Sequence, residues 1–421
     1  MIEEGYPRGL PRLSAADVYE NLTNLCRIGT IWMGTRGEIQ ARNYIKDMMM
    51  RYGLQEVRLE DFEYLSYMPI SSELIVTSPG EETIPCEPLE YSANATTEGE
   101  AVYVGTGRKE DFENLERHGV SLEGKIVLAR SSTPFWITPL AEERGAAGLV
   151  IITDPPEDLI RRCTARIGHP PQRPPFDEYV ANMPGVLTNA IGGDRLLSLL
   201  SAGRVRVRIS QRGEYSTRRA SNVVGVVPGS EMSEKKVLVG AHYDTQLVGG
   251  AKDDAVGVAG LLELARVMAN LHPRRTVVFA AFAGEEIGLW GSTAYVEKHK
   301  DDVRENYVYM CNLDAISSSL TPLNNVWASP RIKDFALKVA AEQGWHVSIV
   351  VDLSSKLREF SDQCAFHEAG VPSTWIYESP NPYYHTEGDV LEHIDPHKSV
   401  KTLSVSGLLV FEAAYRSTLP F

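Results

Sequence analysis

Imidazole and carboxylate side chains recur in this sequence directly after short apolar runs. Seven of them form the candidate set: His242, Asp244, Asp253, Glu285, Glu286, Asp314 and His385. In open α/β sheets, ligands bind beyond the carboxyl ends of the strands, so segments far apart in the chain can bring such side chains to one edge. Nitrogen and oxygen donors suit zinc, with manganese or cobalt as options, and the absence of a thiolate from the set argues against a structural zinc site. The pattern predicts a catalytic metal centre.

The spacing within the set suggests distinct roles. Two metal ions roughly 3.5 to 4 Å apart could share it if one carboxylate bridged them, and Asp253 is the candidate bridge. Neighbouring residues of an extended turn point in different directions, so one of Glu285 and Glu286 can bind metal while the other acts as a base. Asp244 lies two residues after His242, and its carboxylate is expected to accept a hydrogen bond from the imidazole nitrogen that does not bind metal.

Each of these features also has a plain structural explanation. A His-x-Asp sequence after a strand is more often a polar pair than a metal site, Glu-Glu is usually a solvated turn, and Asp314 alone could cap a strand end. Burying such groups unpaired at the end of several apolar strands would be costly, however. The seven residues together therefore support a functional site more strongly than any one of them does alone.

Apolar strands alternate with amphipathic helices in the second half of the chain. The predicted strands are 236–241, 276–282, 307–313, 347–351 and 373–377, and the predicted helices are 254–270, 331–343 and one after His397. This alternation predicts a three-layer α/β/α domain around a mostly parallel mixed sheet. The neighbours Asp253 and Asp254 open one of these helices.

The first half of the chain has two sequence patterns, one helical and one strand-like. Helices are predicted over 15–26, with Ser14 as N-cap, and over 38–51. Short strand-like runs between Gly and Pro then predict an inserted β-rich domain, within which the proline-rich segment 154–185 is interpreted as a loop that covers a cleft. The predicted domains are 1–84 (first part of the α/β domain), 85–213 (the insert) and 214–421 (the remainder, with the metal centre).

Composition restricts the partners of the protein. The chain has 421 residues with 42 Lys plus Arg against 56 Asp plus Glu, a net charge of −14. Such a surface repels phosphate backbones and anionic lipid, so nucleic acid and membranes are not expected as partners. The longest apolar runs, such as 146–152 and 277–283, are shorter than the roughly 18 residues of a membrane-spanning helix.

The expected compartment is the cytoplasm. The N-terminus shows neither the basic start nor the apolar stretch of a secretory signal. The five cysteines are scattered and none lies in a CxxC pair, a pattern typical of reduced, buried thiols. If a signal had been trimmed from the sequence, the protein would instead be secreted.

At the candidate residues the sequence resembles the co-catalytic zinc exopeptidases, a group that includes bacterial aminopeptidases, glutamate carboxypeptidases and the transferrin receptor. The matching motifs are GAHYDT (240–245), GGAKDDAVGVAGLLELAR (249–266), FAGEEIGLWGS (282–292), NLDAI (312–316), SDQCAF (361–366) and YYHTEGD (383–389). The segments 122–132 and 141–154 are similar to the protease-associated domain, which would account for the insert.

The resemblance implies two zinc ions and assigns their ligands. It implies that His242 and Asp314 bind one ion, that Glu286 and His385 bind the other, and that Asp253 bridges them, with a cis peptide bond after it. By the same resemblance the roles at the substrate fall to Glu285, the general base, and Tyr384, which helps to polarise the carbonyl oxygen.

The expected activity is removal of the N-terminal residue from peptides. A carboxypeptidase or dipeptidase on the same scaffold is the nearest alternative, and a receptor-like protein without activity or a glutaminyl cyclase are minor ones. Some bacterial relatives have an arginine directly before the Ser-Asp motif, where this chain has Phe360, with Arg358 two residues earlier. A homodimer is one option for the assembly, and the aromatic residues Trp290, Phe360, Phe366 and Tyr383 are candidates either for a side-chain pocket or for the core.

Overall fold

The computed structural model describes residues 10–156, 158–167, 176–317, 323–354 and 360–421. Contacts divide the chain into two units. Unit 1 comprises Met1–Phe62, Arg219–Asn381 and Asp389–Phe421, and unit 2 comprises Glu63–Arg218 and Pro382–Gly388. The first two boundaries between the units follow Phe62 and Arg218, and they fall inside the long strands β1 (Gln55–Ser78) and β8 (Arg206–Val227). The domain boundaries predicted from the sequence are 84/85 and 213/214.

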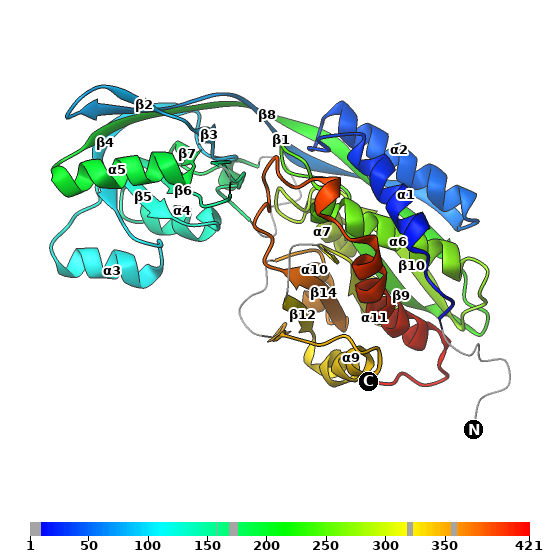
Figure 1. Ribbon diagram of the computed structural model, residues 1–421. Helices are drawn as coiled ribbons and strands as arrows, with labels where there is room; N and C mark the ends of the chain where they lie inside the picture. The colour runs from blue at the N-terminus through cyan, green and yellow to red at the C-terminus, as the bar shows by residue number, and fades with distance from the viewer. Residues whose placement is uncertain (1–9, 157, 168–175, 318–322, 355–359) are drawn as a thin grey trace. The chain divides into compact units, whose positions relative to one another are not determined.

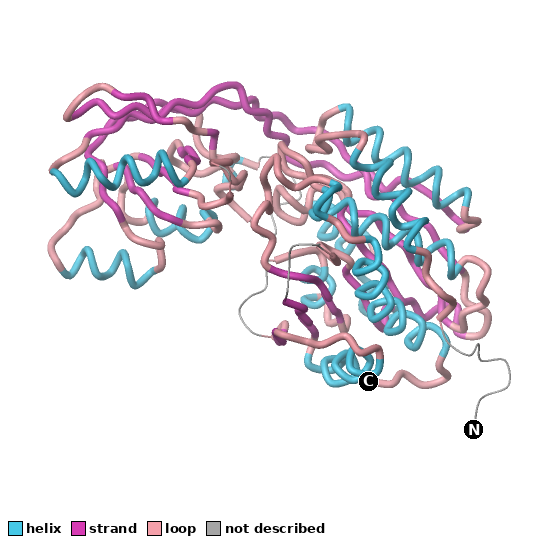
Figure 2. Tube along the Cα trace, in the orientation of Figure 1, coloured by secondary structure: helices cyan, strands magenta, loops and turns pink. Residues whose placement is uncertain are grey.

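Unit 1 alternates helices and strands along the chain, and Figure 2 shows both kinds of element in it, helices in cyan and strands in magenta. Its remaining elements are α1 (Ala15–Cys26), α2 (Arg36–Arg51), β9 (Met232–His242), η2 (Ala251–Ala255), α6 (Val256–Met268), β10 (Arg275–Phe282), α7 (Trp290–Lys298), α8 (Lys300–Asn306), β11 (Tyr307–Asn312), β12 (Leu323–Ala328), α9 (Pro330–Glu342), β13 (Ile349–Asp352), α10 (Gln363–Glu368), β14 (Ser373–Ser379), η3 (Leu391–His393) and α11 (Pro396–Tyr415).

The sheet of unit 1 is mixed and mostly parallel. Its strand order is β13-β12-β14-β11-β9-β10-β8, in which β12 pairs antiparallel with β14 and β8 pairs antiparallel with β10. The other neighbours are parallel. The predicted mixed α/β sheet is therefore confirmed, although the sequence analysis missed β12.

Helices cover both faces of this sheet (Figure 1), which makes three layers. Leu238 of β9 packs in one apolar cluster with Tyr295 of α7 and Phe366 of α10. Because successive side chains of a strand alternate between faces, Val237 and Val239 point to the opposite side, where α6 and α11 pack against β9. All eight residues of β10 are buried, as expected for a strand covered on both faces.

Local capping explains where the first helices begin. The Ser14 side chain accepts a hydrogen bond from the Asp17 N–H at 3.2 Å, which confirms it as the N-cap of α1. Thr35 caps α2 in the same way through the Glu38 N–H, so this helix begins at Arg36 and not at the predicted Glu38.

The strands of unit 2 follow the order β8-β4-β5-β6-β7-β3, with parallel pairing from β4 to β7. Its elements are β2 (Glu82–Ile84), β3 (Glu87–Pro88), β4 (Ala95–Tyr103), α3 (Lys109–Arg117), β5 (Ile126–Arg130), α4 (Pro134–Glu142), β6 (Gly148–Ile152), η1 (Asp177–Tyr179), β7 (Gly185–Thr188) and α5 (Ala190–Ala202). Two apolar clusters lie on alternate residues of these strands, one containing Val127 and the other Ile126 and Leu128. The assignment of this unit to the protease-associated type stays a prediction.

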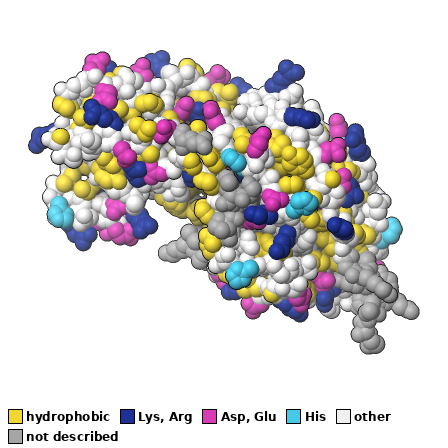
Figure 3. All heavy atoms as spheres, viewed as in Figure 1, with side chains coloured by type: hydrophobic (Ala, Val, Ile, Leu, Met, Phe, Trp, Pro, Cys, Tyr) yellow, Lys and Arg dark blue, Asp and Glu magenta, His cyan; other side chains and the backbone are white. Residues whose placement is uncertain are grey.

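The surface carries both signs of charge. Figure 3 shows acidic and basic side chains interspersed with apolar ones over the face in view. Within the described part of the chain, no helix combines the length and the apolar character that crossing a bilayer requires.

Candidate metal centre

Three parallel strands of unit 1 end at the same edge of the sheet. His242, the last residue of β9, lies opposite Phe282, the last residue of β10, and Asn312 at the end of β11 lies opposite Gly240. The loops that follow therefore start from one edge, as the sequence predicted. Those loops carry Asp253, Glu285, Glu286 and Asp314.

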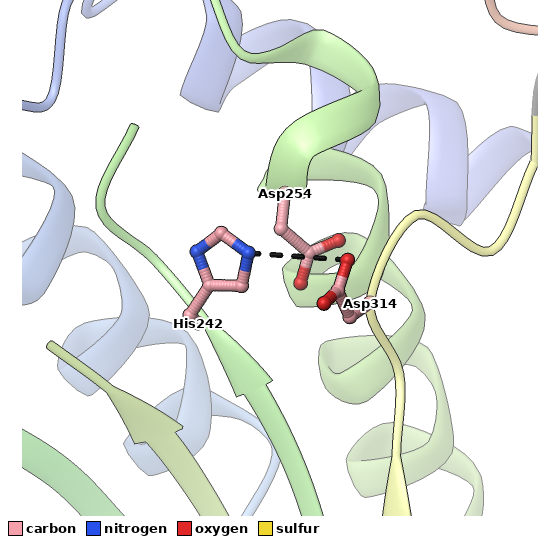
Figure 4. Close-up of side chains that lie close together, drawn as sticks. All are labelled: His242, Asp254 and Asp314. Atoms are coloured by element: carbon pink, nitrogen blue, oxygen red, sulfur yellow. Dashed lines mark ion pairs between the residues drawn. The ribbon is translucent and has the colours of Figure 1, made fainter. Parts of the chain in front are cut away.

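The donor atoms converge beyond this edge. His242 Nε2 lies 3.0 Å from Asp253 Oδ1 and 4.0 Å from Asp314 Oδ1, and Figure 4 shows the imidazole facing the Asp314 carboxylate. One donor atom from each of His242, Asp253 and Glu286 lies within 4.8 Å of the others, and the same holds for His242, Asp254 and Asp314. Both groups are buried, which is the arrangement that a metal-binding site needs.

The electrostatics of these side chains fit a cation. Burial, followed by the nearby Asp253, raises the pKa of Asp314 to about 7. Burial likewise raises the pKa of Asp362 to about 6 and that of Glu285 well above its usual value. Groups of this kind are costly to ionise without a compensating positive charge, which a divalent ion supplies. Imidazole and carboxylate donors without thiolate fit zinc.

Asp254 was not among the predicted ligands. Its Oδ1 accepts hydrogen bonds from the Gly257 N–H at 3.0 Å and the Ala315 N–H at 3.1 Å, so the side chain links the start of α6 to the loop of Asp314. The Asp253–Asp254 peptide bond is cis, as the resemblance implies. Asp253 and Asp254 each contribute an oxygen to one of the two buried donor groups.

Two further positioning residues were also missed. The Asp389 carboxylate accepts the Lys252 N–H at 2.9 Å and the Asp253 N–H at 3.1 Å, and so holds the backbone of the candidate bridge. Gln246 Nε2 donates to Glu286 Oε2 at 3.0 Å. Asp389 ends a motif already noted, which could have identified it, whereas nothing in the sequence distinguishes Gln246.

Asp244 acts differently from the expectation. The imidazole Nδ1 of His242 lies 3.0 Å from the backbone carbonyl of Asp244, whereas the carboxylate Oδ1 is 3.8 Å away. The carboxylate instead accepts the backbone N–H groups of Gly284, Glu285 and Glu286 at 2.8, 3.2 and 3.2 Å. The prediction that the Asp244 carboxylate accepts this hydrogen bond is therefore wrong, and the backbone carbonyl accepts it instead. The carboxylate holds the turn that carries the two glutamates.

His385 and Tyr384 lie in unit 2, in the loop Pro382–Gly388. Their rings stack with centroids 3.6 Å apart, and Tyr384 is 37% exposed. His385 Nδ1 lies 3.1 Å from the backbone carbonyl of Arg162. The roles given to these two residues in the metal centre stay predictions.

The aromatic candidates for a side-chain pocket separate into two kinds. Trp290 and Phe366 are fully buried, and Phe366 packs in the core cluster with Phe282, which favours their role in the core. Phe360 packs edge-on against Trp327 with centroids 5.6 Å apart. Arg358, the arginine that precedes Phe360 by two residues, lies outside the described residues.

Comparison with known proteins identifies the second half of the chain. Residues 222–409 match the family model described as Peptidase family M28. This segment is therefore similar to M28 peptidases. It contains every candidate ligand and the candidate base, so the buried donors described above lie inside the matched region.

Relatives along most of the chain are peptidases of two kinds. Aminopeptidase YwaD of Bacillus subtilis is 26% identical, over 97% of this chain and 86% of the relative. Probable glutamate carboxypeptidases VP8 of Zea mays and AMP1 of Arabidopsis thaliana are 25% and 27% identical, each over 92% of this chain. The chain spans only 65% and 66% of the length of these two plant relatives.

Solved structures of similar fold include other peptidases. The aminopeptidase from Aneurinibacillus sp. strain AM-1 is 25% identical with a TM-score of 0.73, covering 97% of this chain and 96% of that one. A peptidase M28 precursor from Shewanella amazonensis, 20% identical, has a TM-score of 0.77 over 96% of this chain and 94% of that one, which shows the shared fold.

Proposed function

We propose that this protein is a zinc-dependent aminopeptidase that hydrolyses the N-terminal peptide bond of peptides. The observation that carries the proposal is the buried convergence of His242, Asp253, Glu286 and Asp314 at one sheet edge inside the segment that matches Peptidase family M28. The similarity to aminopeptidase YwaD over 97% of the chain supports the choice of this activity within the family.

Two zinc ions fit the proposed ligand set. Asp253 would bridge them, His242 and Asp314 would hold one, and Glu286 and His385 the other. When bound, zinc lowers the pKa of a coordinated water and polarises a carbonyl oxygen. The mixed imidazole and carboxylate donors also accept manganese or cobalt.

Glu285 is suited to move the proton. Its backbone N–H is fixed by Asp244 at 3.2 Å, and its side chain is partly exposed, so water reaches it. Burial raises the pKa of Glu285 well above the usual value, which makes its carboxylate a stronger base. We infer that Glu285 takes the proton of the attacking water and returns it to the leaving amine.

The remaining roles concern the substrate. Tyr384 would donate a hydrogen bond to the carbonyl oxygen as negative charge develops on it. The acidic groups around the centre favour a free α-amine over a free carboxylate, as does the net charge of −14. The proposed substrates are therefore peptides, which the enzyme cleaves at the N-terminal residue.

A carboxypeptidase is the second candidate because the plant relatives carry that name. Both activities are tested by incubating the zinc-loaded protein with a mixed peptide pool and following the termini by mass spectrometry. Loss of N-terminal residues that N-acetylation abolishes is the expected result, and a Glu285→Gln preparation controls for contaminating peptidases. Loss confined to the C-terminus would overturn the proposal in favour of the second candidate.

A further inference from the structure

Within unit 2, the loop Pro382–Gly388 is hydrogen-bonded to the short segment that contains Arg161 and Arg162. The Arg162 N–H donates to the His385 carbonyl at 2.8 Å, and His385 Nδ1 lies 3.1 Å from the Arg162 carbonyl. The two residues thus form a reciprocal pair of bonds although they are 223 positions apart. The neighbouring Arg161 donates to the Pro382 carbonyl at 3.4 Å, and its guanidinium lies 5.6 Å from the centre of the Tyr384 ring.

The bond between His385 and Arg162 determines the tautomer of the imidazole. A backbone carbonyl only accepts hydrogen bonds, so Nδ1 must carry the proton. In a neutral imidazole the lone pair that binds a metal is then on Nε2. The contact therefore fixes both the ring orientation and the nitrogen that is available as a ligand.

The segment that supplies this carbonyl is itself anchored. Arg162 Nη2 lies 2.9 Å from Glu87 Oε2, and Nη1 lies 3.8 Å from Oε1 of the fully buried Glu90. The backbone continues the attachment, because the Glu90 N–H donates to the Cys163 carbonyl and the Ala165 N–H donates to the Glu90 carbonyl. The carbonyl of Arg162 is thus held by its side chain on one side and by backbone bonds on the other.

We propose that Arg162 is a positioning residue for His385, a ligand of the proposed zinc site, and that it acts through this contact. The inference rests on the proposed function, since it requires His385 to bind zinc. It assigns a task to an arginine outside the matched segment 222–409, whose charge is already paired with Glu87.

The test measures zinc affinity of the full chain by chelator competition, with zinc content and circular dichroism alongside. Arg162→Met should weaken zinc binding about 10- to 100-fold, the usual effect of removing a group that orients a metal-bound histidine. Arg162→Lys should restore part of the affinity, because an ammonium can still pair with Glu87. If Arg162→Met folds poorly, Glu87→Gln serves as the test in its place. Glu87 is only partly buried, and its replacement should also weaken zinc binding.

A matched control separates positioning from general stability. Arg166 pairs with Glu142 at 2.7 Å in the same unit, and its side chain is 19% exposed against 15% for Arg162. Arg166→Met should leave zinc affinity unchanged. In a His385→Ala background, Arg162→Met should have no additional effect, because its action passes through the imidazole.

The outcomes distinguish the two levels of the argument. If His385→Ala weakens zinc binding while Arg162→Met and Glu87→Gln leave it unchanged, the proposed function stands and the inference is overturned. An equal loss from Arg162→Met with and without His385 also overturns it. If His385→Ala itself binds zinc like the wild type, then the proposed ligand set is wrong and the inference falls with it.

Discussion

Replacement of Asp244 by Asn provides a sharp test of how the catalytic turn is held. In the folded chain, Oδ1 accepts the N–H groups of Gly284 and Glu285, and Oδ2 accepts that of Glu286. An asparagine keeps one acceptor oxygen and can retain the first two bonds. Its amide group then faces the Glu286 N–H, which loses its acceptor, at a cost of about 1–3 kcal/mol for a buried donor.

A second effect opposes the first. Burial, the largest cause, raises the pKa of Asp244 from 3.8 to about 7. At about 1.4 kcal/mol per pH unit this difference amounts to about 4 kcal/mol against the ionised form in the metal-free protein. Because the folded state binds this proton more tightly than the unfolded state, the wild type loses stability as pH rises from about 4 to about 7. The Asn variant has no such group.

The two magnitudes predict a change of sign with pH. Metal-free Asp244→Asn should be about 1–3 kcal/mol less stable than wild type near pH 4. It should be more stable by a similar amount at pH 8, since about 4 minus 1–3 remains. Between about pH 4 and pH 7 the difference should change by about 1.4 kcal/mol per pH unit, and it should be constant above that range.

The assay is urea denaturation of the chelator-treated protein followed by circular dichroism at pH 5, 6, 7 and 8. Asp301→Asn, at an exposed position of the same unit, is the matched control and should show a flat difference. A difference between Asp244→Asn and wild type that is independent of pH would refute the reasoning, because it would mean that the carboxylate is not held in a desolvated site.

Three further results are expected. Glu285→Gln should keep its zinc, measured by elemental analysis, but lower kcat for peptide hydrolysis by about 10²–10⁴-fold, the contribution of a general base; near-normal turnover would exclude that role. Zinc binding should release more protons at pH 6 than at pH 8, because Asp314, whose pKa is about 7, must ionise to bind the metal. Calorimetry in two buffers of different ionisation enthalpy measures the number of protons released. Equal release at both pH values would contradict this expectation. Burial raises the pKa of Glu90 from 4.5 to about 7. The Glu90→Gln variant should therefore match wild-type stability near pH 4 and exceed it by up to about 3 kcal/mol above pH 7. Urea denaturation measures this, and a difference that is constant across that pH range would argue against a desolvated carboxyl group.

The strands that position the metal donors were predictable where their sequence is apolar throughout. β10 is buried on both faces, so its apolar run marks it as a central strand without further information. β12 was missed because Asn324 and Asn325 disfavour a strand. In the folded chain the Asn325 side chain donates to the Ser379 hydroxyl at 2.8 Å, a partner that only strand pairing brings near.

The unit boundaries could not be predicted for a related reason. β1 and β8 are continuous strands of 24 and 22 residues, and each runs across a boundary. Local sequence shows where a strand begins and ends, but it contains no signal for the point within a strand at which contacts pass from one unit to the other. The predicted boundaries at 84/85 and 213/214 instead followed changes in composition at Pro and Gly.

The sequence by itself determined which donor atoms are available and in what order they follow the strands, because side-chain chemistry and strand periodicity are local properties. The parallel register of β9, β10 and β11 then brought His242, Asp253 and Asp314 to one edge, as expected. Only the tertiary structure decided what orients these groups. The acceptor for His242 is a carbonyl and not the predicted carboxylate, and the acceptor for His385 comes from Arg162, 223 positions away. Backbone carbonyls are present at every residue, so no sequence pattern can indicate which of them a distant imidazole will meet.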